Sequence, residues 1–195
     1  RVPQEALIMT METNQKFVPV FDAEDRLSEH FIGVANIESR NPAEIRKGYE
    51  RVIRPRFADA QFFYDEDRKQ GLAAFQDSLQ SVTYQQALGS VWDKCIRVAE
   101  LARVIANRLG VDAGLATRAA ALSKCDLMTR MVGEFPELQG LMGGYYARAE
   151  GLPGAVADAI RDHYKPVGQG DDVPTAPVTV AVSLADKLDT LAGFF

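Results

Sequence analysis

The chain has 195 residues and a formal net charge of −5; 47% of its residues are hydrophobic and 25% are charged. These values are typical of folded proteins and exclude a disordered or low-complexity chain. The length fits one domain, or a small domain joined to a larger one, and leaves room for a sizeable core. No run of eighteen apolar residues occurs, so we expect no membrane-spanning helix.

The cysteine content and the net charge indicate which cellular environment and which binding partners fit this chain. Cys95 and Cys125 are the only cysteines, lie far apart in the sequence and match no metal-binding spacing. We therefore expect a reduced, cytoplasmic environment. The net negative charge argues against general nucleic-acid binding, although a local basic patch would override it. The sequence starts at Arg1 with neither a signal peptide nor a start methionine, so we interpret the chain as an excised fragment.

The first third of the chain has the pattern of β-strands. Three apolar runs, at residues 6–11, 15–21 and 30–37, predict three strands, with a turn at the polar stretch 22–29. Pro19 interrupts the second run and favours an edge strand or a bulge. Three strands cannot form a sandwich alone, so we assign residues 1–57 to part of a mixed α/β domain.

Helical periodicity replaces this pattern after Pro42. Between residues 92 and 109, apolar positions recur at spacings of three and four, and Gly110 predicts the end of that helix. Further helices are expected at 112–131, from 153 onward and at 177–192. The fold class is therefore α+β overall, with residues 58–195 forming an all-helical domain.

Ionisable residues interrupt the apolar stripes of four predicted helices. Lys94, Asp126, His163 and Asp186 each share a stripe with hydrophobic residues three or four positions away. Since a buried charge is costly unless it is paired or coordinates something, these four residues predict a polar site inside the bundle.

This site resembles that of the HD phosphohydrolase superfamily. The resemblance rests on residues 97–102, the pair Cys125–Asp126, His163 and residues 185–191. It implies an HD-like helical domain, in which active members hold a divalent metal with His, His-Asp and Asp side chains.

Two departures from that pattern argue against catalysis. Lys94 occupies the first His position and Cys125 the second, and a charged lysine has no lone pair for a metal. We therefore interpret Lys94, Cys125, Asp126, His163 and Asp186 as a vestigial site with no metal and no catalytic residue. Our hypothesis is that Lys94 pairs with Asp126 and Asp186; alternatively, Lys94 extends to solvent and Asp126 caps a neighbouring backbone.

A basic segment lies where the strand pattern ends. Residues 46–56 hold five basic residues and one acid, with aromatic residues among and after them. Guanidinium groups bind phosphates and aromatic rings stack on bases, so the segment suits RNA, although a solvated helix face has the same composition. The candidate RNA-binding residues are Arg46, Lys47, Arg51, Arg54, Arg56, Arg68 and Lys69.

Several segments of the sequence closely resemble the β chain of the bacterial tetrameric glycyl-tRNA synthetase family. The strings that carry the resemblance are residues 34–39, 54–63, 67–69, 122–129, 131–135, 139–140 and 185–193. They span essentially the whole chain, which corresponds to a middle piece of the family's full β chain and lacks its anticodon-binding region.

The resemblance implies a role without chemistry of its own. In that family the α subunit activates glycine with ATP and Mg²⁺, and the β subunit binds tRNA within an α2β2 tetramer. We therefore expect this fragment to help position the acceptor arm of glycine tRNA, with no cofactor and no catalytic residue. The alternatives are a metal-dependent HD-type phosphohydrolase acting on nucleotides, or a module that docks other subunits or domains.

Overall fold

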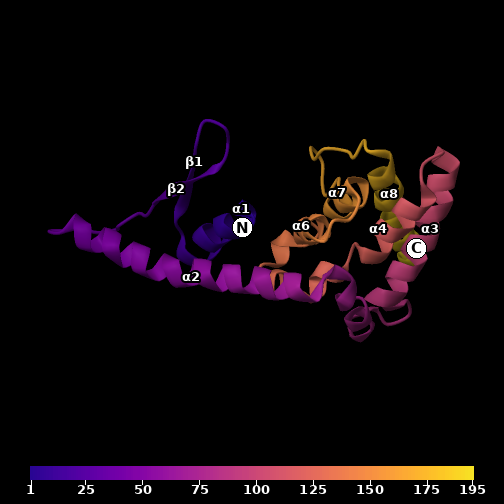
Figure 1. Cartoon of the computed structure of the whole chain (residues 1–195), viewed down its shortest axis with the longest axis horizontal. Helices are drawn as coiled ribbons and strands as arrows, with labels where there is room; N and C mark the ends of the chain where they lie inside the picture. Colours follow the sequence, from indigo (N-terminus) through magenta and orange to yellow (C-terminus); the bar gives the residue numbers. More distant parts are fainter. The chain divides into compact units, whose positions relative to one another are not determined.

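A computed structural model describes all residues, 1–195, and divides the chain into two compact units (Figure 1). Unit 1 is Arg1–Glu66 and unit 2 is Asp67–Phe195. The expected division after residue 57 falls inside the long helix α2, Pro42–Gln70, and the units divide later in that helix. None of the helices is both long and apolar enough to cross a lipid bilayer.

Unit 1 begins with a helix where a strand was predicted. Residues 6–11 lie in α1 (Gln4–Met9) and the π-helical turn η1 (Thr10–Asn14), so this prediction is wrong. The run contains good helix formers and only one β-branched residue before Thr10. Ala6 and Thr10 are both buried one turn apart, and the Thr10 hydroxyl donates to the Ala6 carbonyl at 2.7 Å.

The other two predicted strands form an antiparallel hairpin. Strand β1 is Val18–Phe21 and β2 is Leu27–Ile32, so the third predicted run starts earlier and ends sooner than expected. The register shifts between Pro19 and Phe21, as expected for a proline in a strand. Asp22 accepts the backbone N–H of Arg26 at 2.9 Å and so closes the turn.

Helix α2 packs its inner face against this hairpin. Ile53 forms the core of unit 1 with Phe17 and Met11, and the Phe17 and Tyr49 rings lie 5.0 Å apart between centroids. Gly33 permits this packing, because a Cβ there would lie 2.5 Å from the Tyr49 ring. The inner face of α2 is thereby fixed, and Lys47 and Arg51 project away from it.

Unit 2 is a bundle of helices with one small hairpin. Its α-helices are α3 (Val91–Leu109), α4 (Ala113–Leu122), α5 (Arg130–Glu134), α6 (Leu141–Ala149), α7 (Gly154–Asp162) and α8 (Pro177–Phe194). Short 3₁₀ turns lie at η2 (Leu72–Phe75), η3 (Asp77–Ser81), η4 (Cys125–Met128) and η5 (Pro136–Leu138). Strands β3 (Thr83–Gln85) and β4 (Gly89–Ser90) pair antiparallel, so the expectation of an all-helical region is wrong there.

Helix α3 confirms the predicted periodicity and its end. A capping box of Ser90 and Asp93 starts it, and Gly110 ends it in the left-handed conformation with φ 68°. Helix α8 starts at Pro177 as predicted and continues to Phe194. The helix predicted at 112–131 instead ends at Leu122.

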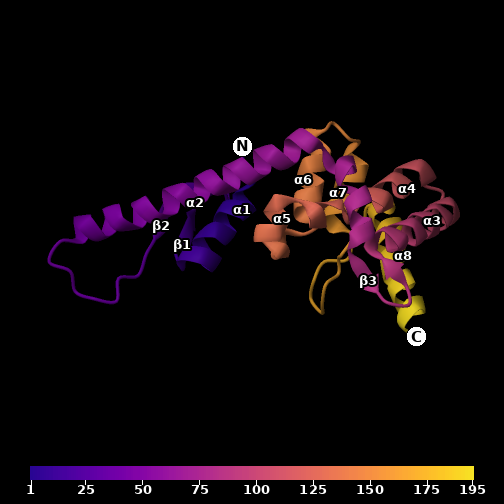
Figure 2. The ribbon, with the colours of Figure 1, turned by 90° about the horizontal axis from the view of Figure 1, so that it is seen from below.

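Small residues bring the helices of unit 2 close together. Helix α3 packs against α4 and α8, and α6 packs against α7 (Figure 2). A Cβ at Gly143 would lie 2.7 Å from Ile160, and one at Gly144 would lie 2.8 Å from Arg161. The two glycines of α6 therefore allow α7 to approach closely, and that approach places the end of α7 at the buried polar site.

Candidate functional site

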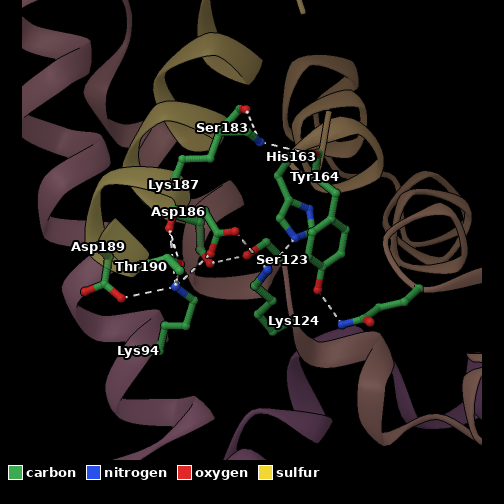
Figure 3. A network of polar contacts seen from close by, with 12 residues as sticks. Lys94, Ser123, Lys124, His163, Tyr164, Ser183, Asp186, Lys187, Asp189 and Thr190 are labelled. Carbon is green, nitrogen blue, oxygen red and sulfur yellow. Dashed lines mark hydrogen bonds and ion pairs between the residues drawn. The ribbon is translucent and has the colours of Figure 1, made fainter. Parts of the chain in front are cut away.

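Ionisable side chains from four parts of unit 2 meet in its interior (Figure 3). Lys94 comes from α3, Lys124 from the turn after α4, His163 from the end of α7 and Asp186 from α8. All four are buried, with exposed fractions between 0% and 8%. The sequence predicted three of them, and Lys124 is the addition.

Lys94 is held between two carboxylates of α8. Its Nζ lies 3.2 Å from Asp186 Oδ1 and 3.1 Å from Asp189 Oδ2, and it donates to the Thr190 hydroxyl at 2.9 Å. Burial alone would lower the Lys94 pKa, but the attraction of Asp186 and Asp189 outweighs it and the pKa is raised. The hypothesis that Lys94 pairs with Asp186 is confirmed; its proposed pairing with Asp126 is wrong.

Lys124 supplies a second buried ammonium group. Its Nζ lies 2.9 Å from His163 Nε2, 3.3 Å from Asp186 Oδ2 and 3.8 Å from the centre of the Tyr164 ring. Burial lowers the pKa of Lys124 to about 8, against the opposing attraction of Asp186. Asp186 therefore bridges two lysines, one at each carboxylate oxygen.

His163 is a neutral imidazole with a defined orientation. Its Nδ1 lies 2.7 Å from the Ile160 carbonyl oxygen, which can only accept, so we assign the proton to Nδ1. The Nε2 lone pair then faces the Lys124 ammonium, which donates to it. Burial and the adjacent Lys124 charge lower the pKa of His163 to about 3.

Asp126 caps the start of a helix. Its Oδ2 accepts the backbone N–H of Gly140 at 2.6 Å and of Gly143 at 2.9 Å, at the start of α6. Its buried Oδ1 has no hydrogen-bond partner, and burial raises the Asp126 pKa to about 6 despite the two backbone bonds. The alternative interpretation of Asp126, as a backbone cap, is therefore confirmed.

Cys125 is buried beside this network. Its side chain is fully buried, and burial raises the pKa of its thiol. A thiol that resists deprotonation is a poor nucleophile and a poor metal ligand. No group of three or more His, Cys, Asp or Glu side chains is arranged to hold a metal ion.

Asp189 extends the network to a third cation. Arg97 of α3 donates from Nε to Asp189 Oδ1 at 2.7 Å, while Lys94 contacts Asp189 Oδ2. Asp189 lies three residues after Asp186, so both project from one side of α8. That spacing is the sequence signal that would have added Asp189 and Arg97 to the predicted site.

The seven candidate RNA-binding residues are all exposed. Lys47, Arg51 and Arg54 follow one another at spacings of four and three and therefore lie on one face of α2. Lys47 pairs with Glu44 at 3.0 Å and Arg54 lies 3.7 Å from Glu50. Arg46, Arg51 and Arg56 also belong to unit 1, whereas Arg68 and Lys69 belong to unit 2.

The aromatic residues of this segment do not share the basic face. Tyr49 and Phe57 pack against the core of unit 1, and Tyr64 is buried. Phe62 is 54% exposed. The exposed face is therefore mainly cationic, which suits contacts with phosphates more than stacking with bases.

Sequence comparison places the whole chain in one family. A family profile described as "Glycyl-tRNA synthetase beta subunit" matches residues 1–195. The "Glycine--tRNA ligase beta subunit" of Xanthomonas campestris pv. campestris (strain B100) is 58% identical over 194 residues. The proteins of that name from Pseudomonas savastanoi pv. phaseolicola and Pseudomonas syringae pv. syringae are 55% and 54% identical.

These matches cover all of this chain but only part of each relative. Each takes in 100% of this chain, whereas the chain spans only 28% of the length of each relative. Because the identity is above half and the profile covers every residue, the chain belongs to the glycyl-tRNA synthetase β-subunit family.

Proposed function

We propose that this chain is a non-catalytic, tRNA-binding portion of a glycine–tRNA ligase β subunit. In this proposal it supports ATP-dependent attachment of glycine to tRNA by positioning the acceptor arm. The observation that carries the proposal is the exposed cationic face of α2 in a chain of this family.

The spacing on α2 suits a phosphate backbone. Lys47, Arg51 and Arg54 span seven residues, which corresponds to about 10 Å along a helix. Arginine binds phosphate through two parallel N–H groups, and such contacts fix a nucleic acid in place without reading its bases. Arg46 and Arg56 lie seven residues before and three residues after Ile53, so they add positive charge on the side of α2 that holds Ile53.

The buried network supports a role without catalysis. Lys124 donates to the Nε2 lone pair of His163 and to one oxygen of Asp186, and Lys94 Nζ lies 3.2 Å from the other oxygen, which accepts no hydrogen bond. The imidazole lone pair and both oxygens of Asp186 therefore already face ammonium groups, which compete with a metal ion or a substrate proton. This arrangement disfavours the alternative of an HD-type phosphohydrolase, whose metal would need the same lone pairs.

The partners follow from the family. We propose that an α subunit supplies the site that uses ATP and Mg²⁺ to activate glycine, within an α2β2 tetramer in the cytoplasm. The residues of this chain then contribute to binding tRNA, and no cofactor is assigned to them.

A charge-reversal experiment on the assembled enzyme tests this function. The variant Arg51→Glu/Arg54→Glu in the full-length β subunit should weaken tRNA binding and flatten its dependence on salt, because fewer phosphate contacts form. The KM for tRNA in aminoacylation should rise, while glycine-dependent ATP–pyrophosphate exchange should stay unchanged.

A matched control places the same two substitutions on another helix. Arg103→Glu/Arg108→Glu changes two exposed arginines of α3 and should leave tRNA affinity near that of the parent enzyme. Unchanged affinity and an unchanged salt slope in the α2 variant would contradict the proposal.

A further inference from the structure

Helix α8 has two apolar faces, and only one of them is covered. Its inner face is buried in the bundle through Ala181, Val182 and Ala185. Near its end, Gly193 faces Leu88, and the Phe194 ring lies 6.0 Å from the Tyr84 ring, edge to face. These contacts fix the rotation of α8 and determine which side chains point outward.

The outward face is a stripe of large hydrophobic residues. Leu184, Leu188 and Leu191 are 43%, 46% and 56% exposed, and Phe195 continues the stripe. Single exposed leucines are common on protein surfaces, but an aligned set on one helix marks an interaction site. The stripe adjoins the buried face, so α8 is apolar over a wide arc, as expected of a helix that packs against more than one neighbour.

The spacing of the stripe indicates the kind of partner. Successive members are separated by four, three and four residues, which is the repeat by which two helices pack along a shared seam. The complementary surface is another helix with apolar residues at the same spacing. Such a helix would lie along α8 over about three turns.

The apolar area of the stripe indicates which kind of partner can bind to it. Three half-exposed leucines and one phenylalanine offer on the order of 300–400 Å² of apolar surface. A stable interface between separate molecules needs roughly 800 Å² from each partner. The stripe alone is therefore too small to hold a second copy or another subunit, whereas a tethered segment gains from its high effective concentration.

The relatives provide such a segment. This chain spans 28% of their length, so most of the polypeptide in those proteins lies outside the residues described. We propose that the stripe Leu184, Leu188, Leu191 and Phe195 is the docking surface for an amphipathic helix from that remaining part of the same polypeptide. The contact joins this bundle to the rest of the β subunit and does not depend on the tRNA-binding proposal.

Site-specific photo-crosslinking in the full-length β subunit, assembled with its α subunit, tests this inference. Leu188→p-benzoylphenylalanine should crosslink, on irradiation, to a peptide of the same polypeptide outside these 195 residues. The product should migrate as a single β chain, and its yield should not change with protein concentration. The crosslinked peptide, identified by mass spectrometry, should show apolar residues at helical spacing.

The control places the same crosslinker at Val104, which is 41% exposed on α3 and lies off the stripe. A product of doubled mass, a crosslink to the α subunit, or a yield at position 188 no higher than at position 104 would overturn the inference.

A second measurement covers the case in which the bulky crosslinker disturbs α8. Leu188→Gln and Leu191→Gln keep the helix but remove apolar surface. In the full-length protein these substitutions should speed hydrogen exchange in a helix outside the 195 residues, and no such change would also overturn the inference.

Discussion

Lys124 Nζ lies 2.9 Å from Nε2 of His163 in the interior of unit 2, so a lysine ammonium occupies the lone pair of a fixed, neutral imidazole. Histidines that bind metals are commonly oriented by a hydrogen bond from their other ring nitrogen, and His163 has such a bond to the Ile160 carbonyl. The site thus holds an oriented imidazole and a carboxylate, with an internal cation between them.

The two buried lysines should differ in what they contribute to stability. The pKa of Lys94 is raised, so its surroundings favour the charged form, whereas the pKa of Lys124 is lowered to about 8. Lys94→Met should therefore cost about 3–5 kcal/mol in unfolding free energy, because it leaves Asp186 and Asp189 underpaired. Lys124→Met should cost about 1–2 kcal/mol, since the desolvation penalty disappears with the charge. Denaturant unfolding measures both, and a larger loss for Lys124→Met would contradict this account.

Gly143 should tolerate no side chain. A Cβ there would lie 2.7 Å from Ile160 and 3.1 Å from the Asp126 carboxylate oxygen that caps α6. Gly143→Ala should destabilise the protein by about 1–3 kcal/mol through overpacking. Gly133 in α5 is the matched control, since nothing lies within 4 Å of its added Cβ and its φ is not positive. Gly133→Ala should be neutral or stabilise by about 0.4–1 kcal/mol, and equal effects at the two glycines would refute the explanation.

Sequence patterns that involve only neighbouring residues predict several helices and their ends correctly. The periodicity of α3, its glycine stop at Gly110 and the proline start of α8 at Pro177 need only neighbouring residues to form. The apolar run at residues 6–11 fits a strand as well as a helix, because a run this short shows no measurable period. Its helical state depends on burial of Ala6 and Thr10 in unit 1, which is a tertiary effect.

Lys124 was missed for a related reason. A helix continuing through residue 131 would place Lys124 off the apolar stripe, so the stripe pattern does not include it in the site. Helix α4 ends at Leu122, and the following turn redirects Lys124 to the interior while Asp126 points to α6. Thr129 then caps a new helix by accepting the backbone N–H of Val132 at 3.2 Å. The break depends on a cap and on contacts with distant residues, which the stripe pattern does not encode.

The pH dependence of stability should show two opposing buried groups. His163 has a pKa of about 3 in the fold against 6.5 for an ordinary histidine, so the unfolded chain binds more protons between these values. Its contribution makes stability rise with pH in that window. Asp126 has a pKa of about 6 against 3.8, so the folded chain binds more protons and stability falls as pH rises from about 4 to 6. At pH 5 the two slopes nearly cancel.

Substitutions at Asp126 and His163 separate their two contributions to the pH dependence of the unfolding free energy. Asp126→Asn keeps an oxygen for the backbone of α6 but removes the titration, so stability at pH 4–6 should rise by about 1.4 kcal/mol per pH unit relative to the parent. His163→Gln should shift the slope by a similar amount in the opposite direction. Denaturant unfolding at several pH values measures both. Slopes that match the parent in both variants would mean that neither group titrates as described.

Asp67 should be the most sensitive carboxylate at the start of unit 2. It is 2% exposed and accepts three hydrogen bonds: from the backbone N–H of Arg130 at 2.9 Å, that of Met131 at 3.0 Å, and the Tyr146 hydroxyl at 2.8 Å. Because the first two donors open helix α5, Asp67→Ala leaves buried N–H groups without partners and should cost about 3–5 kcal/mol. Tyr146→Phe removes one hydrogen bond and should cost about 1 kcal/mol in unfolding free energy.

The control is Asp65→Ala, which lies two residues earlier on the exposed side of α2. It should change the unfolding free energy by less than about 0.5 kcal/mol. Similar losses for Asp65→Ala and Asp67→Ala would show that these three bonds do not anchor the helix.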